Sequence, residues 1–83
     1  MIHVYILHSE TTQRYYVGST QDVDNRLGEH NHSESASTRG GVPWRVVRVE
    51  DFDTRSEAMR RERQTRSRGI ERYLKDLTKG EPG

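Results

Sequence analysis

Residues 2–18, IHVYILHSETTQRYYVG, contain two short apolar runs separated by a polar segment. In the first run Ile2, Val4 and Ile6 alternate with Tyr5 and Leu7. Alternation places these two sets on opposite faces of an extended chain, and both sets are large and apolar. The pattern therefore predicts a strand over residues 2–8 that is covered on both faces.

The second run predicts another strand over residues 14–19. If the chain folds back near Glu10 and Thr11, Tyr5 lies directly opposite Tyr16. Residues opposite each other in an antiparallel pair share a face and lie about 5 Å apart. We therefore expect the two phenol rings to project together, provided that the register holds, because a slip of one residue would send them to opposite faces.

Downstream, Thr20 is a candidate N-cap for a helix through residue 31, with Val23 and Leu27 on its inner face. Residues 33–41, SESASTRGG, are small and polar and predict a mobile surface loop. Residues 44–51, WRVVRVED, predict a third strand. Trp44 at its start fits either a core position or a platform for base stacking.

Residues 54–57, TRSE, have the spacing of a capping box and predict the start of a second helix that breaks near Gly69. Ala58 and Met59 supply its inner face, and Glu62 occupies the next inward position, where an apolar residue is normal. A third helix is amphipathic, with apolar residues at Ile70, Tyr73, Leu74 and Leu77. The fold class that follows is a small single α/β domain: a three-stranded, mostly antiparallel sheet flanked by three helices. We expect the domain to span residues 1–78 and residues 79–83 to form a flexible tail.

The composition limits the class of protein. The chain has 83 residues, no cysteine and 33% charged residues. Disulfides and thiolate metal sites are therefore excluded, and no apolar run reaches the roughly 18 residues of a membrane span. The N-terminus lacks the features of a signal peptide. We expect a soluble cytoplasmic protein, monomeric or weakly dimeric.

The charge is unevenly distributed, although the net charge is only +1. Residues 1–53 carry −3 and residues 54–79 carry +5. A basic half on a nearly neutral chain suggests a surface for phosphates. The alternative is a solvated helix face with internal ion pairs.

The sequence resembles the GIY-YIG nuclease superfamily over nearly its whole length. HVY at residues 3–5 and YVG at residues 16–18 match the two motifs, and Arg26, His30 and Glu62 match the family's later positions. The segments TRGGVPWRVV and FDTRSEAMRRERQ are similar to small stand-alone bacterial members. There are two departures. His3 replaces the first motif's glycine, and no asparagine follows Asn31, whereas larger family enzymes have one late in the domain.

The resemblance implies a DNA endonuclease that uses one Mg²⁺ or Mn²⁺ ion. Tyr5, Tyr16, Arg26 and His30 would be catalytic, and Glu62 would be catalytic and bind the metal. Gly18 would close the second motif. The chemistry fits, since one carboxylate with water and phosphate oxygens can hold Mg²⁺, and a guanidinium can bind a non-bridging oxygen. Tyr16 is assigned as general base or water-positioner and Tyr5 as a hydrogen-bond donor, although either tyrosine could take the proton.

The expected partner is DNA, contacted through arginines at Arg39, Arg45, Arg60, Arg61, Arg63, Arg66 and Arg68. Phosphate contacts carry little sequence information, so we expect selectivity for single-stranded or branched DNA. DNA repair, recombination and defence are all compatible roles. One alternative is a non-catalytic nucleic-acid-binding module, suggested by the missing asparagine. Another is a protein–protein adaptor that uses the charged helices. Glu62 itself could also be a surface residue that only pairs with Arg66 one turn on.

Overall fold

A computed structural model of the chain describes residues 1–32 and 38–79. Its strands are β1 (Ile2–Ser9), β2 (Tyr15–Thr20) and β3 (Trp44–Phe52), and its helices are α1 (Val23–Asn31), α2 (Arg55–Arg68) and α3 (Ile70–Lys79). The strands form one antiparallel sheet in the order β2-β1-β3. The predicted fold class is confirmed. Within the described ranges, no helix is long and apolar enough to cross a bilayer.

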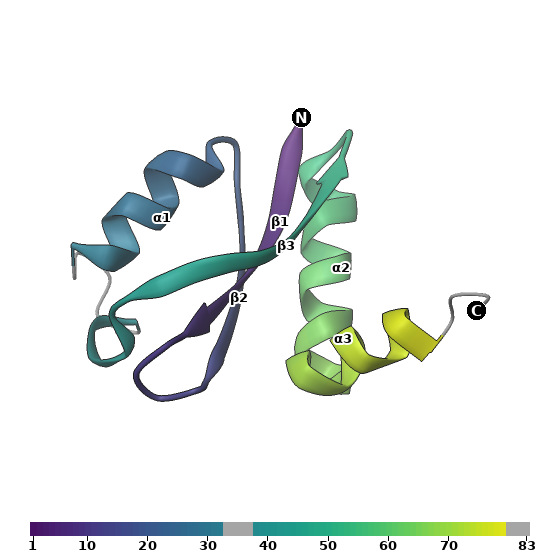
Figure 1. The fold of residues 1–83 in the computed structure, drawn as a ribbon. Helices are drawn as coiled ribbons and strands as arrows, with labels where there is room; N and C mark the ends of the chain where they lie inside the picture. The colour runs from purple at the N-terminus through teal and green to yellow at the C-terminus, as the bar shows by residue number, and fades with distance from the viewer. Residues whose placement is uncertain (33–37, 80–83) are drawn as a thin grey trace.

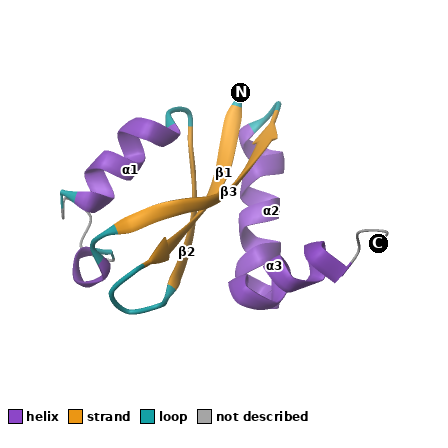
Figure 2. Ribbon diagram, in the orientation of Figure 1, coloured by secondary structure: helices purple, strands orange, loops and turns teal. Residues whose placement is uncertain are grey.

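The sheet lies between two helical layers, with α1 on one face and α2 on the other (Figures 1 and 2). Ile2, Val4 and Ile6 pack with Ala58 of α2, and residues of α3 close this side. Tyr5 and Leu7 pack with Trp44 on the α1 side. The central strand is therefore buried on both faces, as its alternating pattern predicts, and Trp44 is a core residue, 7% exposed.

The register of the β1–β2 hairpin differs from the prediction. Tyr5 pairs with Gly18, and Tyr16 pairs with Leu7. The cause is the turn, which is centred later than Glu10 and Thr11: Ser9 Oγ accepts hydrogen bonds from the N–H groups of Thr11 and Thr12, and the Ser9 N–H donates to Arg14 O. The shift is two residues, so both tyrosines stay on one face as diagonal neighbours.

Helix α1 starts later than predicted. Asp22, not Thr20, is its N-cap, and its carboxylate accepts a hydrogen bond from Asn25 N at 3.1 Å. Thr20 Oγ1 instead accepts from Asp22 N and so holds the approach to the helix. Asp is as good an N-cap as Thr or better, because its carboxylate also interacts favourably with the positive end of the helix dipole.

The predicted loop over residues 33–41 is only partly correct. Residues 33–37 lie outside the described residues. After them, Thr38 is buried and Arg39–Gly41 form a short 3-10 helix, so this part is not a mobile surface loop. The indole of Trp44 packs directly on Gly41, where a Cβ would overlap the ring, and its Nε1 donates to Thr38 O at 2.7 Å.

Helix α2 begins at the predicted capping box, with Thr54 Oγ1 accepting from Glu57 N, and Gly69 ends it with a φ of +94°. Left-handed backbone of this kind favours glycine, which explains the break between α2 and α3. The predicted inner face is half wrong: Ala58 is buried but Met59 is 47% exposed. Thr65 is buried instead, two turns after Ala58, since its hydroxyl donates to a carbonyl of its own helix.

A network of charged and polar groups fixes α2 and α3 against β3. Glu50 accepts hydrogen bonds from Arg48, Arg61 and Tyr73, and its side chain is only 12% exposed. Burial on its own raises the pKa of Glu50, but the hydrogen bonds from Tyr73 and Arg48 and the charge of Arg61 outweigh it, so the net pKa lies below the usual value.

We expect Glu50→Gln to lower the free energy of unfolding by about 2 kcal/mol at pH 7, because Arg61 and Arg48 lose their charged partner. The folded-state pKa of Glu50 is depressed, so its stabilisation is present above the pKa of the unfolded carboxyl and disappears as the pH falls through the folded-state value. Urea unfolding of both proteins from pH 7 to pH 3 measures this difference. A gap that stays constant over that range contradicts the role of Glu50.

Candidate active site

Three aromatic side chains meet on the α1 face of the sheet. Tyr5 comes from β1, Tyr16 from β2 and His30 from the last turn of α1. The ring centroids of Tyr5 and Tyr16 are 6.3 Å apart, and those of Tyr16 and His30 are 4.9 Å apart. Tyr5 is 1% exposed and His30 is fully buried, whereas Tyr16 is partly exposed. Tyr16 is therefore the one of these three rings that solvent or a substrate can reach.

Gly18 makes this arrangement possible. It pairs with Tyr5 across the sheet, and the Tyr5 hydroxyl lies directly over it. A Cβ at residue 18 would lie 2.6 Å from the Tyr5 hydroxyl oxygen and 3.2 Å from Cε1 of Tyr16. The glycine that closes the second motif thus provides the space that the two tyrosines fill.

Arg26 lies one turn before His30. Its guanidinium donates to Glu29 at 2.9 Å, and it is close enough to Tyr5 to act on the pKa of the phenol. Burial raises the pKa of Tyr5 to about 12, since the effect of Arg26, which lowers it, is smaller, and nearby Tyr16 and Glu62 raise it further. Tyr5 is therefore a neutral phenol at physiological pH.

His30 is held at both ring nitrogens. Tyr5 Oη lies 3.0 Å from Nε2, and Thr38 Oγ1 lies 2.7 Å from Nδ1. Burial, followed by the positive charge of Arg26, lowers the pKa of His30, so its imidazole is neutral at pH 7. Each of these hydroxyls can donate to or accept from the ring nitrogen beside it, so Tyr5 and Thr38 together determine which nitrogen of His30 carries the proton.

No pattern in the sequence marks Thr38 as a site residue, although it opens the segment TRGGVPWRVV that is similar to small family members. Its place beside His30 depends on tertiary contacts.

Thr38→Val should lower the free energy of unfolding by about 1–2 kcal/mol, because the buried Nδ1 loses its hydrogen-bond partner. It should also release the tautomer of His30, which ¹⁵N NMR of the imidazole reports directly. Thr38→Ser keeps the hydroxyl and is the control. An unchanged tautomer and stability in the valine variant would contradict the role of Thr38.

Glu62 approaches the site from α2. Its side chain is 20% exposed and makes a loose ion pair with Arg66, with 3.5 Å between Nη2 and Oε1. Its negative charge is close enough to raise the pKa of Tyr5. Tyr5, Tyr16 and His30 therefore lie together, and the charges of Arg26 and Glu62 act on the pKa of Tyr5, although these five residues come from four different elements.

The donor set fits a metal ion that needs few protein ligands. Among the described residues there is no cluster of three or more histidine or acidic side chains that could bind a metal. Glu62 offers one accessible carboxylate, held only by the loose contact with Arg66. Mg²⁺ is commonly bound by one or two carboxylates, with water and substrate phosphates completing its coordination. Glu62 would therefore suit Mg²⁺ or Mn²⁺, and the described residues provide no group of histidines such as a zinc site needs.

The predicted DNA-binding arginines fall into two groups. Arg39, Arg45, Arg60 and Arg63 are exposed. Three others contact the protein itself. Arg61 is held by Glu50 and Tyr73, Arg68 makes two hydrogen bonds with Asp76, and Arg66 donates to Val17 O as well as pairing with Glu62. Arg61 thus lies in the junction between α2, α3 and β3, whereas the first group is available to a ligand.

Comparison with known proteins agrees with this geometry. The family model described as the GIY-YIG catalytic domain matches residues 1–80. UPF0213 protein VNG_2274C of Halobacterium salinarum is 48% identical over 64 residues, which cover 75% of this chain and 80% of that protein. The structure-specific endonuclease subunit slx1 of Schizosaccharomyces pombe is 35% identical over 79 residues, or 87% of this chain and 29% of that protein.

A solved structure has the same fold. The solution NMR structure of UPF0213 protein BH0048 from Bacillus halodurans superposes with a TM-score of 0.58 at 30% identity, over 96% of this chain and 86% of that one. UPF0213 relatives also occur in other bacteria, including Staphylococcus saprophyticus. The match to the family model extends over both tyrosine motifs, all three strands and all three helices. The chain belongs to the GIY-YIG family.

Proposed function

We propose that this protein is a divalent-metal-dependent DNA endonuclease that prefers single-stranded or branched DNA. The observation that carries the proposal is the convergence of Tyr5, Tyr16, Arg26, His30 and Glu62 on one site. Hydrolysis of a phosphodiester needs an oriented water, positive charge at the phosphate and stabilisation of the leaving oxygen. The membership of a nuclease family supports the same reaction, and the similarity to a structure-specific endonuclease subunit supports branched DNA as a substrate.

The two tyrosines differ in solvent exposure, and we assign them different roles on that basis. Tyr16 is partly exposed and can contact the attacking water, so we assign it to positioning that water or taking its proton. Tyr5 is buried, and its raised pKa makes it a poor base. Its hydroxyl instead hydrogen-bonds with His30, and Arg26, whose charge acts on Tyr5, would bind a non-bridging phosphate oxygen.

Glu62 would hold the metal ion together with water and the substrate phosphate. The ion would supply positive charge against the developing charge of the phosphate and leaving oxygen. The neighbouring Arg66 is 3.5 Å from Glu62 and can move to the DNA backbone when the carboxylate takes up a cation. The exposed arginines Arg39, Arg45, Arg60 and Arg63 would contact further phosphates.

The test is cleavage of end-labelled single-stranded, duplex and flap DNA by the purified protein. With Mg²⁺ or Mn²⁺ we expect cleavage at least about tenfold faster on single-stranded or flap DNA than on duplex, and EDTA should abolish it. Binding should weaken steeply with salt, because the contacts are mainly to phosphates. Cleavage in EDTA would contradict the metal. Salt-sensitive binding without any cleavage would instead indicate a non-catalytic binding module, and no binding at all would indicate an adaptor.

A further inference from the structure

A cavity adjoins the candidate site, and of its lining residues only Tyr16 has a part in the chemistry described above. It has a volume of about 470 Å³ and lies between the β1–β2 turn and the Arg39–Gly41 turn. Tyr16 and Trp44 are its aromatic lining on the α1 face of the sheet, Thr12 and Arg14 lie on the turn side, and Gly40 faces it from the other. Tyr15 also borders it, but the Tyr15 ring packs with the core on the opposite face of the sheet. Tyr16 belongs both to this cavity and to the cluster around Tyr5.

We propose that this cavity binds one unpaired nucleobase of the DNA strand whose phosphate lies at Tyr16 and Arg26. The proposal rests on the nuclease function proposed above and specifies its substrate as a strand with a base free to leave its stack. Each base has an aromatic face that stacks on aromatic side chains, and polar edges that hydrogen-bond with hydroxyl and guanidinium groups. The walls of this cavity offer both kinds of contact.

The walls are rigid, as a stacking site requires. Trp44 is 7% exposed, its Nε1 donates to Thr38 O, and its backbone is bound on both sides by the amide of Asn31. The rings of Tyr16 and Trp44 meet nearly edge to face, with centroids 6.4 Å apart. Little side-chain freedom is therefore lost when a base enters, which favours binding.

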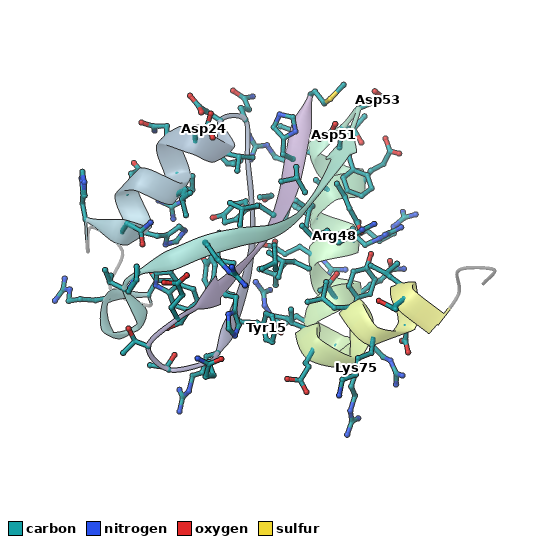
Figure 3. The ribbon with its side chains drawn as sticks, in the orientation of Figure 1. Tyr15, Asp24, Arg48, Asp51, Asp53 and Lys75 are labelled. Atoms are coloured by element: carbon teal, nitrogen blue, oxygen red, sulfur yellow. The ribbon has the colours of Figure 1, made fainter. Side chains whose placement is uncertain are left out.

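Charge distinguishes this cavity from another of similar size. A cavity of about 440 Å³ beside α1 is lined by Val46 and Val49 and by three aspartates, Asp22, Asp24 and Asp51, which would repel a nucleotide. Figure 3 shows Asp24 and Asp51 at the opposite end of the molecule from Tyr15. The described residues that line the Tyr16 cavity include Arg14 but no Asp or Glu. A nucleotide whose base lies in this cavity can therefore keep its phosphate close to the cation of Arg14.

Gly40 provides a direct test. It lines the cavity, and a Cβ at this position meets no atom within 4 Å, so a larger side chain fits at the edge of the cavity without a clash. Gly40→Leu should therefore occlude the base site and leave Tyr5, Tyr16 and His30 in place. Gly28→Leu is the matched control, because a Cβ at Gly28 also meets no atom within 4 Å and Gly28 does not line this cavity.

The experiment uses the full chain carrying Glu62→Gln, so that DNA remains intact. A thymidine pentanucleotide with one 5-iodouracil is bound and irradiated, and the cross-linked peptide is identified by mass spectrometry. We expect cross-links at Tyr16 or Trp44, reduced at least fivefold by Gly40→Leu and unchanged by Gly28→Leu. A pentanucleotide of abasic units should bind the Gly28→Leu control about 5- to 10-fold more weakly than the thymidine pentanucleotide does. The two pentanucleotides should bind Gly40→Leu equally well.

The outcomes separate the two proposals. Two results would overturn the base site: cross-links confined to helix α2, or tighter binding of thymidine than of abasic DNA that persists in Gly40→Leu. In either case, cleavage by the wild type would still support the nuclease. Cross-links in the cavity together with wild-type protein that never cleaves DNA would uphold the base site and overturn the nuclease. Absence of binding to the pentanucleotide would overturn the base site.

Discussion

Glu62→Gln is expected to abolish DNA cleavage while the protein stays folded and still binds DNA. The substitution keeps the size of the side chain and removes the negative charge that would hold the metal ion. Loss of the ion removes several kcal/mol of transition-state stabilisation, and about 4 kcal/mol corresponds to roughly a thousandfold in rate. Stability should change by no more than about 0.5 kcal/mol, because the only ion pair that Glu62 makes in the described structure is the loose one with Arg66.

Three measurements on the same samples check this result: cleavage rate with Mg²⁺, DNA affinity in EDTA, and urea unfolding. Glu71→Gln is the matched control, because Glu71 also pairs with a cation one turn on, Lys75 at 3.5 Å, but is exposed on α3. Equal cleavage by both variants would remove Glu62 from the site. A large loss of stability in Glu62→Gln would show that the carboxylate is structural.

The sequence predicted those parts of the fold that depend on local patterns. Alternation identified the central strand and both of its buried faces, and the Thr54 box and Gly69 gave the limits of α2. The spacing of the tyrosines gave their common face, because a shift of two residues preserves it. The register itself was wrong, since it depends on the hydrogen bonds that Ser9 makes with the turn, and sequence spacing does not reveal which residue a turn centres on.

Parts that depend on tertiary contacts were not predictable. Thr38 becomes part of the site only because the chain after α1 returns to His30. Arg61 belongs to a segment rich in arginine. In the structure it donates hydrogen bonds to Glu50 and Tyr73 and so lies in the junction between α2, α3 and β3. A charge pattern shows that a segment is basic, but which cations remain available depends on the carboxylates that folding brings next to them.

Gly18→Ala is expected to damage both stability and activity through a single carbon atom. The new Cβ would lie 2.6 Å from the Tyr5 hydroxyl oxygen and 2.9 Å from Cζ, well inside contact distance. Tyr5 cannot move aside freely, because its hydroxyl is bound to His30 and its ring is 1% exposed. We expect a loss of about 2–3 kcal/mol in the free energy of unfolding, typical of an overpacked core.

The same displacement should lower cleavage, because moving Tyr5 disturbs its contacts with His30 and Tyr16, which we propose to act in catalysis. A double-mutant cycle isolates the cause. Tyr5→Phe removes the oxygen nearest to the new Cβ, so Gly18→Ala should cost less stability in that background, with a coupling of about 1 kcal/mol or more between the two sites. Gly28→Ala is the control: its Cβ meets no atom within 4 Å, and alanine in a helix should raise stability by about 0.5–1 kcal/mol. If Gly18→Ala costs the same stability with and without the Tyr5 hydroxyl, the clash is not with that hydroxyl. Gly18 would then be required by the backbone of β2 and not by the packing of Tyr5.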